Sequence, residues 1–211
     1  VAFRIANKLV GNNEDAAALE ITAMGPTLKF HEDLVIALSG AKLKSVLNGV
    51  EIPWMTAIEV KKGDTLKLGA VIGNGFRAYL SVRGGIDVPK YLGSRATFTF
   101  GGFGGHEGRP LKPGDALRIS KDENQTEGYE LRKHLNFNIE TDYSKEWEVG
   151  VIPGPHGAPD FFTHEDEEMF YNTAWRVNYN SNRLGYRLEG PSPTFARKDG
   201  GEGGRHPYNA Y

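Results

Sequence analysis

Short segments that alternate polar and apolar residues, separated by glycine-containing turns, dominate the N-terminal part of this sequence. The clearest alternation runs from Arg77 to Arg83 and is typical of a half-buried strand. Glycine makes up 27 of the 211 residues, roughly twice its usual share of about 7%, without a Gly-X-Y period that would indicate collagen. Together with 9 tyrosines and 11 phenylalanines, this indicates short strands joined by tight turns. The sequence therefore predicts a mostly β fold with a few short helices.

The same periodicity predicts the individual elements. An amphipathic helix is expected over Val1–Val10, ended by the glycine and asparagines that follow it. A second helix is expected over Asp160–Tyr171, with Asp160 as its N-cap and the acidic run Glu165–Glu168 as a solvated face. The other predicted strands cover residues 19–24, 27–30, 34–38, 44–50, 56–60, 65–68, 147–152, 175–179 and 186–188.

A polar segment divides the sequence into two parts. Residues 121–146 are rich in charged and amide side chains, which is typical of a linker or an excursion. We therefore expect a first lobe over residues 1–120 and a second lobe over residues 147–211. The sequence starts inside a helical pattern and its glycine-rich end has no closing element. We expect a fragment in which the first lobe lacks an N-terminal segment and the second is incomplete at its C-terminus.

Charge and composition narrow the classes of partner. The net charge is −2 with acids and bases interspersed, which argues against binding to nucleic acid. No apolar run approaches the ~20 residues that cross a bilayer, and no signal peptide is recognisable. The absence of cysteine excludes a disulfide scaffold and cysteine-ligated zinc, and His164, Glu165 and Glu168 have no partner cluster. We predict a cytoplasmic protein that binds no metal, membrane or nucleic acid.

The strongest candidate for a functional site is the glycine-rich run Gly101–Arg109. Glycines permit positive φ and bring backbone N–H groups close to a ligand, so such a loop can hold an oxyanion or a planar ureido group. No Gly-Lys-Ser/Thr or helical pattern follows, which excludes a nucleotide P-loop, and no βαβ unit surrounds it, which excludes a dinucleotide fingerprint. The alternative is a glycine-rich barrel corner with His106 and Arg109 as ordinary surface residues.

Three further segments offer weaker signals. Arg83 and Asp87 flank a turn after the best strand, where an ion pair that stabilises the turn is the simpler interpretation. Pro153–His156 is a stiff loop that presents an imidazole able to move protons near neutrality. The run Ser181-Asn182-Arg183 suits a carboxylate or amide ligand, or else forms a polar hairpin tip.

Two Gly-Asp turns repeat along the chain. Residues 61–68 resemble residues 111–119, and in both a Gly-Asp pair comes directly before a segment with strand character. The repeat is interpreted as two similar turns that lead into strands, with no chemical role for either aspartate.

Several motifs, taken together and in order, resemble one known family. They span the chain from Val1 to about residue 209: Arg4–Asn12, Ala18–Thr22, Arg77–Pro89, Tyr91–Ser94, Gly104–Leu111 and Ser181–Leu188. The series resembles the allophanate hydrolase subunit 2 family, which is the second half of the carboxyltransferase module of biotin-dependent urea carboxylase. Fungal urea amidolyase carries the same module.

This resemblance implies a fold and a reaction. The fold would be two cyclophilin-like β-barrel lobes, and the reaction would move a carboxyl group from carboxybiotin to a urea nitrogen to give allophanate. Biotin would sit on a separate biotin carboxyl carrier domain, ATP would be used by a separate biotin carboxylase domain, and a subunit 1-type half would complete the module. We expect the isolated fragment to be inactive. Two alternatives stay open: a component of ATP-dependent 5-oxoprolinase, which needs no biotin, and a regulatory interaction module without enzymatic activity.

The resemblance and the residue types together give the candidate site residues. Three groups are candidates to accept the urea proton, and the sequence does not rank them: His106, His156 and Asp160. Seven residues are candidates to bind the substrates, the first three through their loop backbone: Gly102, Phe103, Gly105, Arg109, Ser181, Asn182 and Arg183.

Overall fold

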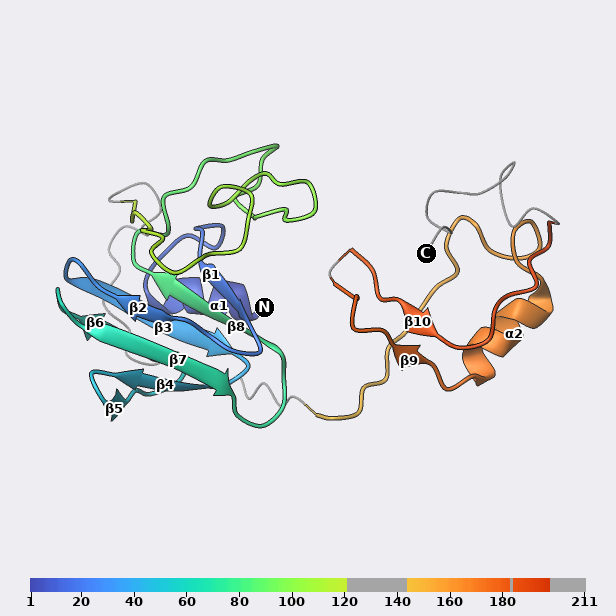
Figure 1. Ribbon diagram of the computed structural model, residues 1–211, viewed down its shortest axis with the longest axis horizontal. Helices are drawn as coiled ribbons and strands as arrows, with labels where there is room; N and C mark the ends of the chain where they lie inside the picture. The colour runs from blue at the N-terminus through green and yellow to red at the C-terminus, as the bar shows by residue number, and fades with distance from the viewer. Residues whose placement is uncertain (121–143, 183, 198–211) are drawn as a thin grey trace. The chain divides into compact units, whose positions relative to one another are not determined.

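The structure is a computed structural model that describes residues 1–120, 144–182 and 184–197 (Figure 1). The chain divides into two compact units, Val1–Trp147 and Glu148–Tyr211. The described residues are mostly β, with two short helices, so the predicted fold class is confirmed. The expected linker over residues 121–146 lies almost entirely outside the described residues, and the expected lobe boundaries stay a prediction.

Two antiparallel four-stranded sheets build the first unit. One sheet has the order β1 (Leu19–Thr22), β8 (Arg77–Val82), β3 (Leu34–Gly40), β6 (Ala57–Val60). The other has the order β2 (Thr27–Lys29), β7 (Thr65–Val71), β4 (Leu43–Leu47), β5 (Val50–Glu51). A single bridge between Met24 and Ala70 connects the edge that follows β1 to β7. All strands predicted between residues 19 and 83 are present, with ends that differ by a few residues.

Alternation along the strands creates the core between these two sheets. In β7, Leu66 and Leu68 are buried while Thr65 and Lys67 are exposed, which gives the period of two that the sequence predicts. The buried side chains that meet in this core come from both sheets: Ile21, Phe30, Ile36, Leu38, Leu43, Val60, Leu66, Leu68, Ala78, Leu80 and Val82. Fully burying a leucine or isoleucine contributes about 1.5–3 kcal/mol, so this cluster is the main source of stability in the first unit.

Strand β3 does not alternate, because both of its faces are covered. Its residues from Ile36 to Gly40 are all buried. Helix α1 (Ala2–Leu9) packs across β3 and β8 and places Ile5 and Leu9 against Ala37. The first unit therefore has three layers, with α1 on one face of the first sheet and the second sheet on the other.

A buried polar network ties α1 to the end of β8. Asn7 accepts a hydrogen bond from Ser81 Oγ at 2.8 Å, and both side chains are fully buried. Asn12 donates to the Val82 carbonyl at 2.8 Å and accepts from the Gly84 amide at 2.8 Å. These asparagines belong to the first sequence motif, so that motif fixes the turn that follows β8.

This turn launches a long excursion, residues 88–117, from the end of the sheet. Asp87 donates its amide to Arg118 O at 2.8 Å, and Ser120 donates to Gly85 O at 3.0 Å, so the two ends of the excursion lie side by side. Gly84 has φ +93°, and a Cβ at this position would overlap the Ser120 carbonyl. In Figure 1 the excursion is the green to yellow loop that follows β8.

The second unit corrects three expectations. Helix α2 (His164–Asn172) begins later than predicted, and its N-cap is Thr163 rather than Asp160. The acidic run is not uniformly solvated, because Asp166 is buried and completes a capping box with Thr163. Residues 147–152 form no strand, and the Ile152 side chain is 90% exposed instead of packing against a sheet. Among the described residues of this unit, β9 (Arg176–Val177) and β10 (Leu188–Glu189) form a two-stranded antiparallel sheet.

Within the described ranges, neither helix is long and apolar enough to cross a membrane.

Candidate functional site

The glycine-rich loop folds back on itself through its aromatic residues. Phe98 donates its amide to Phe103 O at 2.9 Å, and their rings lie 5.1 Å apart. The amides of Gly102 and Phe103 both donate to Phe98 O, at 2.9 and 3.3 Å. Two of the amides expected to face a ligand are therefore already used within the loop. The amides of Gly104 and Gly105 donate to no other described residue. Within this loop, these two amides are therefore the candidates to donate to a ligand.

Close packing explains why glycine occupies these positions. Gly104 and Gly105 have φ of +74° and +52°, in the left-handed region that disfavours other residues. A Cβ at Gly104 would overlap the Ala96 carbonyl, and one at Gly105 would overlap Thr97 Oγ1. The positions of these two amides, which have no acceptor among the described residues, thus depend on close contacts that only glycine permits.

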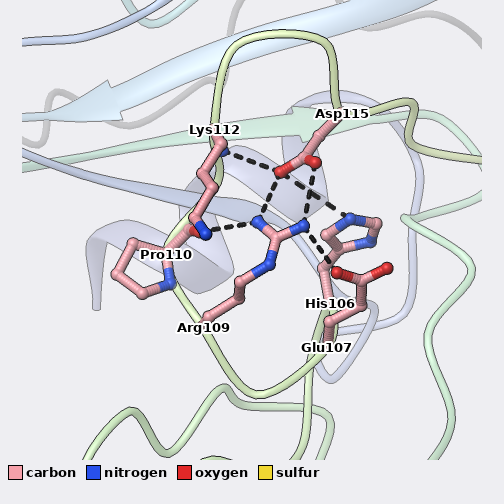
Figure 2. A network of polar contacts seen from close by, with 6 residues as sticks. All are labelled: His106, Glu107, Arg109, Pro110, Lys112 and Asp115. Atoms are coloured by element: carbon pink, nitrogen blue, oxygen red, sulfur yellow. Dashed lines mark hydrogen bonds and ion pairs between the residues drawn. The ribbon is translucent and has the colours of Figure 1, made fainter.

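Arg109 is fully engaged inside the excursion (Figure 2). Its Nη1 and Nη2 donate to the two carboxylate oxygens of Asp115, at 2.7 and 2.9 Å, in the bidentate geometry that arginine favours. Nη1 also donates to Pro110 O at 3.0 Å, and Nη2 to Glu107 Oε2 at 2.5 Å. Of the five guanidinium donors, only Nε–H has no acceptor among the described residues. In this conformation Arg109 braces the loop, which leaves little of the expected substrate-binding role.

Asp115 is the centre of this cluster, although the sequence predicted no chemical role for it. Besides Arg109, it accepts from the Lys112 amide at 2.7 Å and lies 3.8 Å from His106 Nε2. The hydrogen bonds from Arg109 and Lys112 hold the pKa of Asp115 well below its ordinary value, so the carboxylate is charged at neutral pH. Its side chain is only 16% exposed, and that of His106 is 25% exposed. Figure 2 shows the imidazole and the guanidinium meeting the same carboxylate.

A sequence signal for Asp115 exists in the repeated Gly-Asp turn. Asp64 in the first copy accepts from the Lys61 amide at 2.7 Å, as Asp115 does from Lys112, so the two turns are alike. Only the first leads into a strand, β7; residues 116–120 form none, apart from an isolated bridge between Ile119 and Ile86. The copies differ six residues upstream, where Ile58 stands in the first and Arg109 in the second. A cation at that position, and not the turn itself, distinguishes the second aspartate.

The second unit holds the other two candidate bases. His156 lies edge-on against Phe161, with ring centroids 4.6 Å apart, and the Arg197 guanidinium lies 4.8 Å from the same ring. Asp160 is exposed in the adjoining turn, where the Phe161 amide donates to Gly157 O at 3.1 Å. His156 and Asp160 thus share one short turn before α2.

The candidate binding residues of the second unit form a hairpin tip. Ser181 Oγ donates to Asn178 O at 2.7 Å and accepts from the Arg187 amide at 3.0 Å. Asn182 Oδ1 accepts from the Leu184 amide at 2.8 Å. These contacts match the hairpin-tip interpretation, and the Asn182 side-chain NH2 group has no acceptor among the described residues. Arg183 lies outside the described residues.

The structure groups the predicted residues in two sets. His106, Arg109 and the glycines lie in one loop of the first unit, whereas His156, Asp160, Ser181 and Asn182 lie in the second. Among residues 1–120, 144–182 and 184–197, no group of three or more histidines or carboxylates is placed to hold a metal ion.

An open cavity of about 350 Å³ lies elsewhere on the first unit. Glu32, Asp33 and Glu59 line it, and Lys61 pairs with Asp33 at 3.2 Å and with Glu59 at 3.9 Å. Arg83 and Lys61 line the same cavity, so its wall carries charges of both signs.

Comparison with known proteins adds the family. Residues 1–209 match the family model described as carboxyltransferase domain, subdomain A and B. The chain is 48% identical over 212 aligned residues to urea amidolyase of Saccharomyces cerevisiae, covering 100% of this chain and 12% of that protein. It is 38% identical over 191 residues to a 5-oxoprolinase subunit of Escherichia coli, covering 90% of this chain and 57% of that protein. The crystal structure of K. lactis urea amidolyase superposes with a TM-score of 0.78 at 48% identity, covering 94% of this chain and 12% of that one.

The resemblance drawn from the sequence motifs is confirmed by these matches. The chain spans about one eighth of the urea amidolyase that it matches, as its 12% coverage shows. Because the family model covers nearly the whole chain, the chain belongs to the carboxyltransferase domain family, subdomains A and B.

Proposed function

We propose that this chain is part of the carboxyltransferase domain of a urea carboxylase, which moves the carboxyl group from carboxybiotin to a urea nitrogen and forms allophanate. The observation that carries the proposal is the 48% identity to a urea amidolyase along the full length of the chain. The identity to the 5-oxoprolinase subunit is lower, 38%, and covers 90% of the chain. The remaining parts of the proposal are a biotin carried on a separate carrier domain, ATP used by a separate biotin carboxylase domain, a subunit 1-type partner and a cytoplasmic location.

The glycine-rich loop fits the ureido ring of biotin. Such a ring has apolar faces and a carbonyl oxygen that accepts hydrogen bonds. Phe103 is 38% exposed, and it is followed directly by the two amides of Gly104 and Gly105 that have no described acceptor. When bound, carboxybiotin supplies the carboxyl group for transfer.

Within this proposal, the two glycine amides donate to the ureido oxygen, where negative charge builds as the carboxyl group leaves. Fixed donors aimed at developing charge are among the strongest contributions to catalysis, and loss of one typically lowers kcat by about 10²–10³-fold. Gly102 and Phe103 support these donors by holding the loop closed on Phe98.

His106 is the proton acceptor that the loop geometry favours. A urea nitrogen is a poor nucleophile and must lose a proton as it is carboxylated, which requires a base within hydrogen-bond reach. His106 follows the two amides directly and faces the Asp115 carboxylate at 3.8 Å. His156 and Asp160 remain candidates from the second unit, and Ser181, Asn182 and Arg183 are proposed to orient urea or the carboxyl group.

The test uses the full-length protein that contains this chain. We expect urea-dependent release of ADP, with allophanate as the product, and loss of both when the biotin-bearing lysine is replaced. Turnover that depends on 5-oxoproline and survives the loss of biotin would instead favour the 5-oxoprolinase alternative. An absence of turnover with either substrate, with binding to partner proteins retained, would favour the regulatory alternative.

A further inference from the structure

The two Gly-Asp turns of the chain have the same local geometry. In each, the aspartate carboxylate accepts from the amide three residues earlier at 2.7 Å, from Lys61 to Asp64 and from Lys112 to Asp115. In each, the aspartate amide also donates to the carbonyl of that lysine, at 3.0 and 3.1 Å. Both aspartates therefore close their turn in the same way.

Only the second aspartate holds charged groups of a candidate site. Asp115 binds Arg109 through two hydrogen bonds and lies 3.8 Å from His106 Nε2. Asp64 instead accepts from the Asn48 side chain at 2.7 Å, on an exposed surface. This difference separates what Asp115 does for the turn from what it does for the glycine-rich loop.

Backbone hydrogen bonds connect Arg109 to the segment that carries the Gly104 and Gly105 amides. The Arg109 amide donates to His106 O at 3.4 Å, and the Gly108 amide donates to Gly104 O at 2.9 Å. Holding the Arg109 side chain on Asp115 therefore restrains the backbone from residue 104 to residue 109. The same carboxylate faces the imidazole of His106, so one group sets the position of both the donors and the candidate base.

We propose that Asp115 is a positioning residue for carboxyl transfer: through Arg109 and His106 it holds the glycine-rich loop in its reactive geometry. This inference rests on the proposed function. Asp115 has no contact with the reacting atoms in the proposal, and its effect comes through the groups it holds. A misplacement of about 1 Å at such a site costs on the order of 10²-fold in rate, so the effect belongs in kcat.

The experiment compares Asp115→Asn with the matched control Asp64→Asn in the full-length protein. Asp115→Asn is expected to lower kcat for urea-dependent ADP release by about 10–10²-fold, with KM for urea changed less than about threefold. Asp64→Asn is expected to stay within about twofold of the parent in both measurements. Arg109→Lys keeps the turn but removes the bidentate contact, and is expected to reproduce the loss in kcat.

Equal losses in the two aspartate variants, or a kcat of Asp115→Asn within about twofold of the parent, would overturn the proposal. If Asp115→Asn does not fold, an unchanged kcat in Arg109→Lys would overturn it equally. A readout without substrate separates this inference from the proposed function: the backbone amide resonances of Gly104 and Gly105 are expected to shift in Asp115→Asn and not in Asp64→Asn. If they shift while the parent has no urea-dependent turnover, the proposed function fails, and only the hold of Asp115 on the conformation of the loop stands.

Discussion

At the scale of single residues, the glycine-rich loop offers a matched pair of substitutions. Gly105→Ala would force a Cβ into Thr97 Oγ1, whereas a Cβ at Gly102 would meet no atom within 4 Å. Both positions have positive φ, so each alanine carries a backbone cost of roughly 1–2 kcal/mol, and only Gly105→Ala adds an overlap. We expect Gly105→Ala to lower urea-dependent turnover of the full-length protein by at least about tenfold, because a free amide is displaced. Equal losses at the two positions would contradict this account.

The buried asparagines predict a stability effect without any chemistry. Asn7→Ala would leave Ser81 Oγ and the Ala16 carbonyl without their present partner in a fully buried site. Leaving a buried polar group unsatisfied costs about 1–3 kcal/mol, and we expect that decrease in the free energy of unfolding. Urea denaturation measures it, with the exposed Asn13→Ala as a control expected to stay within about 0.5 kcal/mol of the parent. A matching loss in Asn13→Ala would show that the effect is not specific to the network.

Asp115 shows what residue-level reasoning can and cannot extract from this sequence. The two turns have the same geometry, but only the first leads into a strand as predicted. The repeat itself was visible in the sequence. The link to Arg109 was not, because a bidentate contact depends on how the chain between residues 109 and 115 curves back. Arg109 was expected to bind a substrate on the strength of its charge, but its charge is met inside the loop.

At the scale of elements, α2 depends on one buried carboxylate. Asp166 accepts from the amides of Thr163, Thr194 and Phe195, so it joins the start of the helix to a distant segment. These amides, Thr194 first, lower the pKa of Asp166 below its ordinary value. A lowered folded-state pKa means that the stabilisation is complete above the unfolded pKa of about 3.9 and is lost as the pH falls below it.

Asp166→Asn tests this directly. The side-chain NH2 group of the asparagine would face backbone amides that also donate. We therefore expect a lower Tm for the second unit at pH 7. The difference from the parent should shrink at pH 3, which lies below the unfolded pKa of about 3.9, because unfolding of the parent then takes up a proton. Glu165→Gln, an exposed change in the same helical turn, is expected to leave the Tm nearly unchanged at both pH values. A constant difference between pH 3 and pH 7 would rule out the carboxylate as its cause.

The elements that were predicted well are those whose own residues alternate between polar and apolar. Strand β7 was found because one of its faces is buried and the other is exposed, which the alternation of polar and apolar residues reports directly. The sequence of β8 alternates as well, although α1 covers its second face and Ser81 is buried there. The start of α2 was placed too early because Asp160 and Thr163 are both good N-cap residues, and the backbone of the preceding turn decides between them. Residues 147–152 have the composition of a strand but, within the described part of the chain, no partner strand.

At the scale of the whole molecule, stability and candidate chemistry are unevenly distributed. Every buried apolar side chain in the described ranges lies in the first unit, from Ile5 to Ile86. The glycine-rich loop is carried by this core through the turn after β8, whereas His156 and Asp160 lie in exposed positions of the second unit. The sequence predicted where the core strands lie, but not that the buried apolar side chains of the described ranges are confined to the first unit.

This uneven distribution predicts how the chain responds to a core mutation. Leu66 is fully buried between the two sheets, and Leu66→Ala should lower the free energy of unfolding of the first unit by about 2–5 kcal/mol, because it removes buried methyl groups and leaves a cavity. Hydrogen exchange of the β3 and β8 amides measures that loss residue by residue. The amides of α2 should keep their exchange rates, because α2 contributes no side chain to the core that holds Leu66. Val50→Ala, at a side chain 70% exposed, is the control and should change neither set. If the amides of α2 lose as much protection as those of β3 in Leu66→Ala, the two units unfold as one, and the stability of the candidate loop is not set by the first core alone.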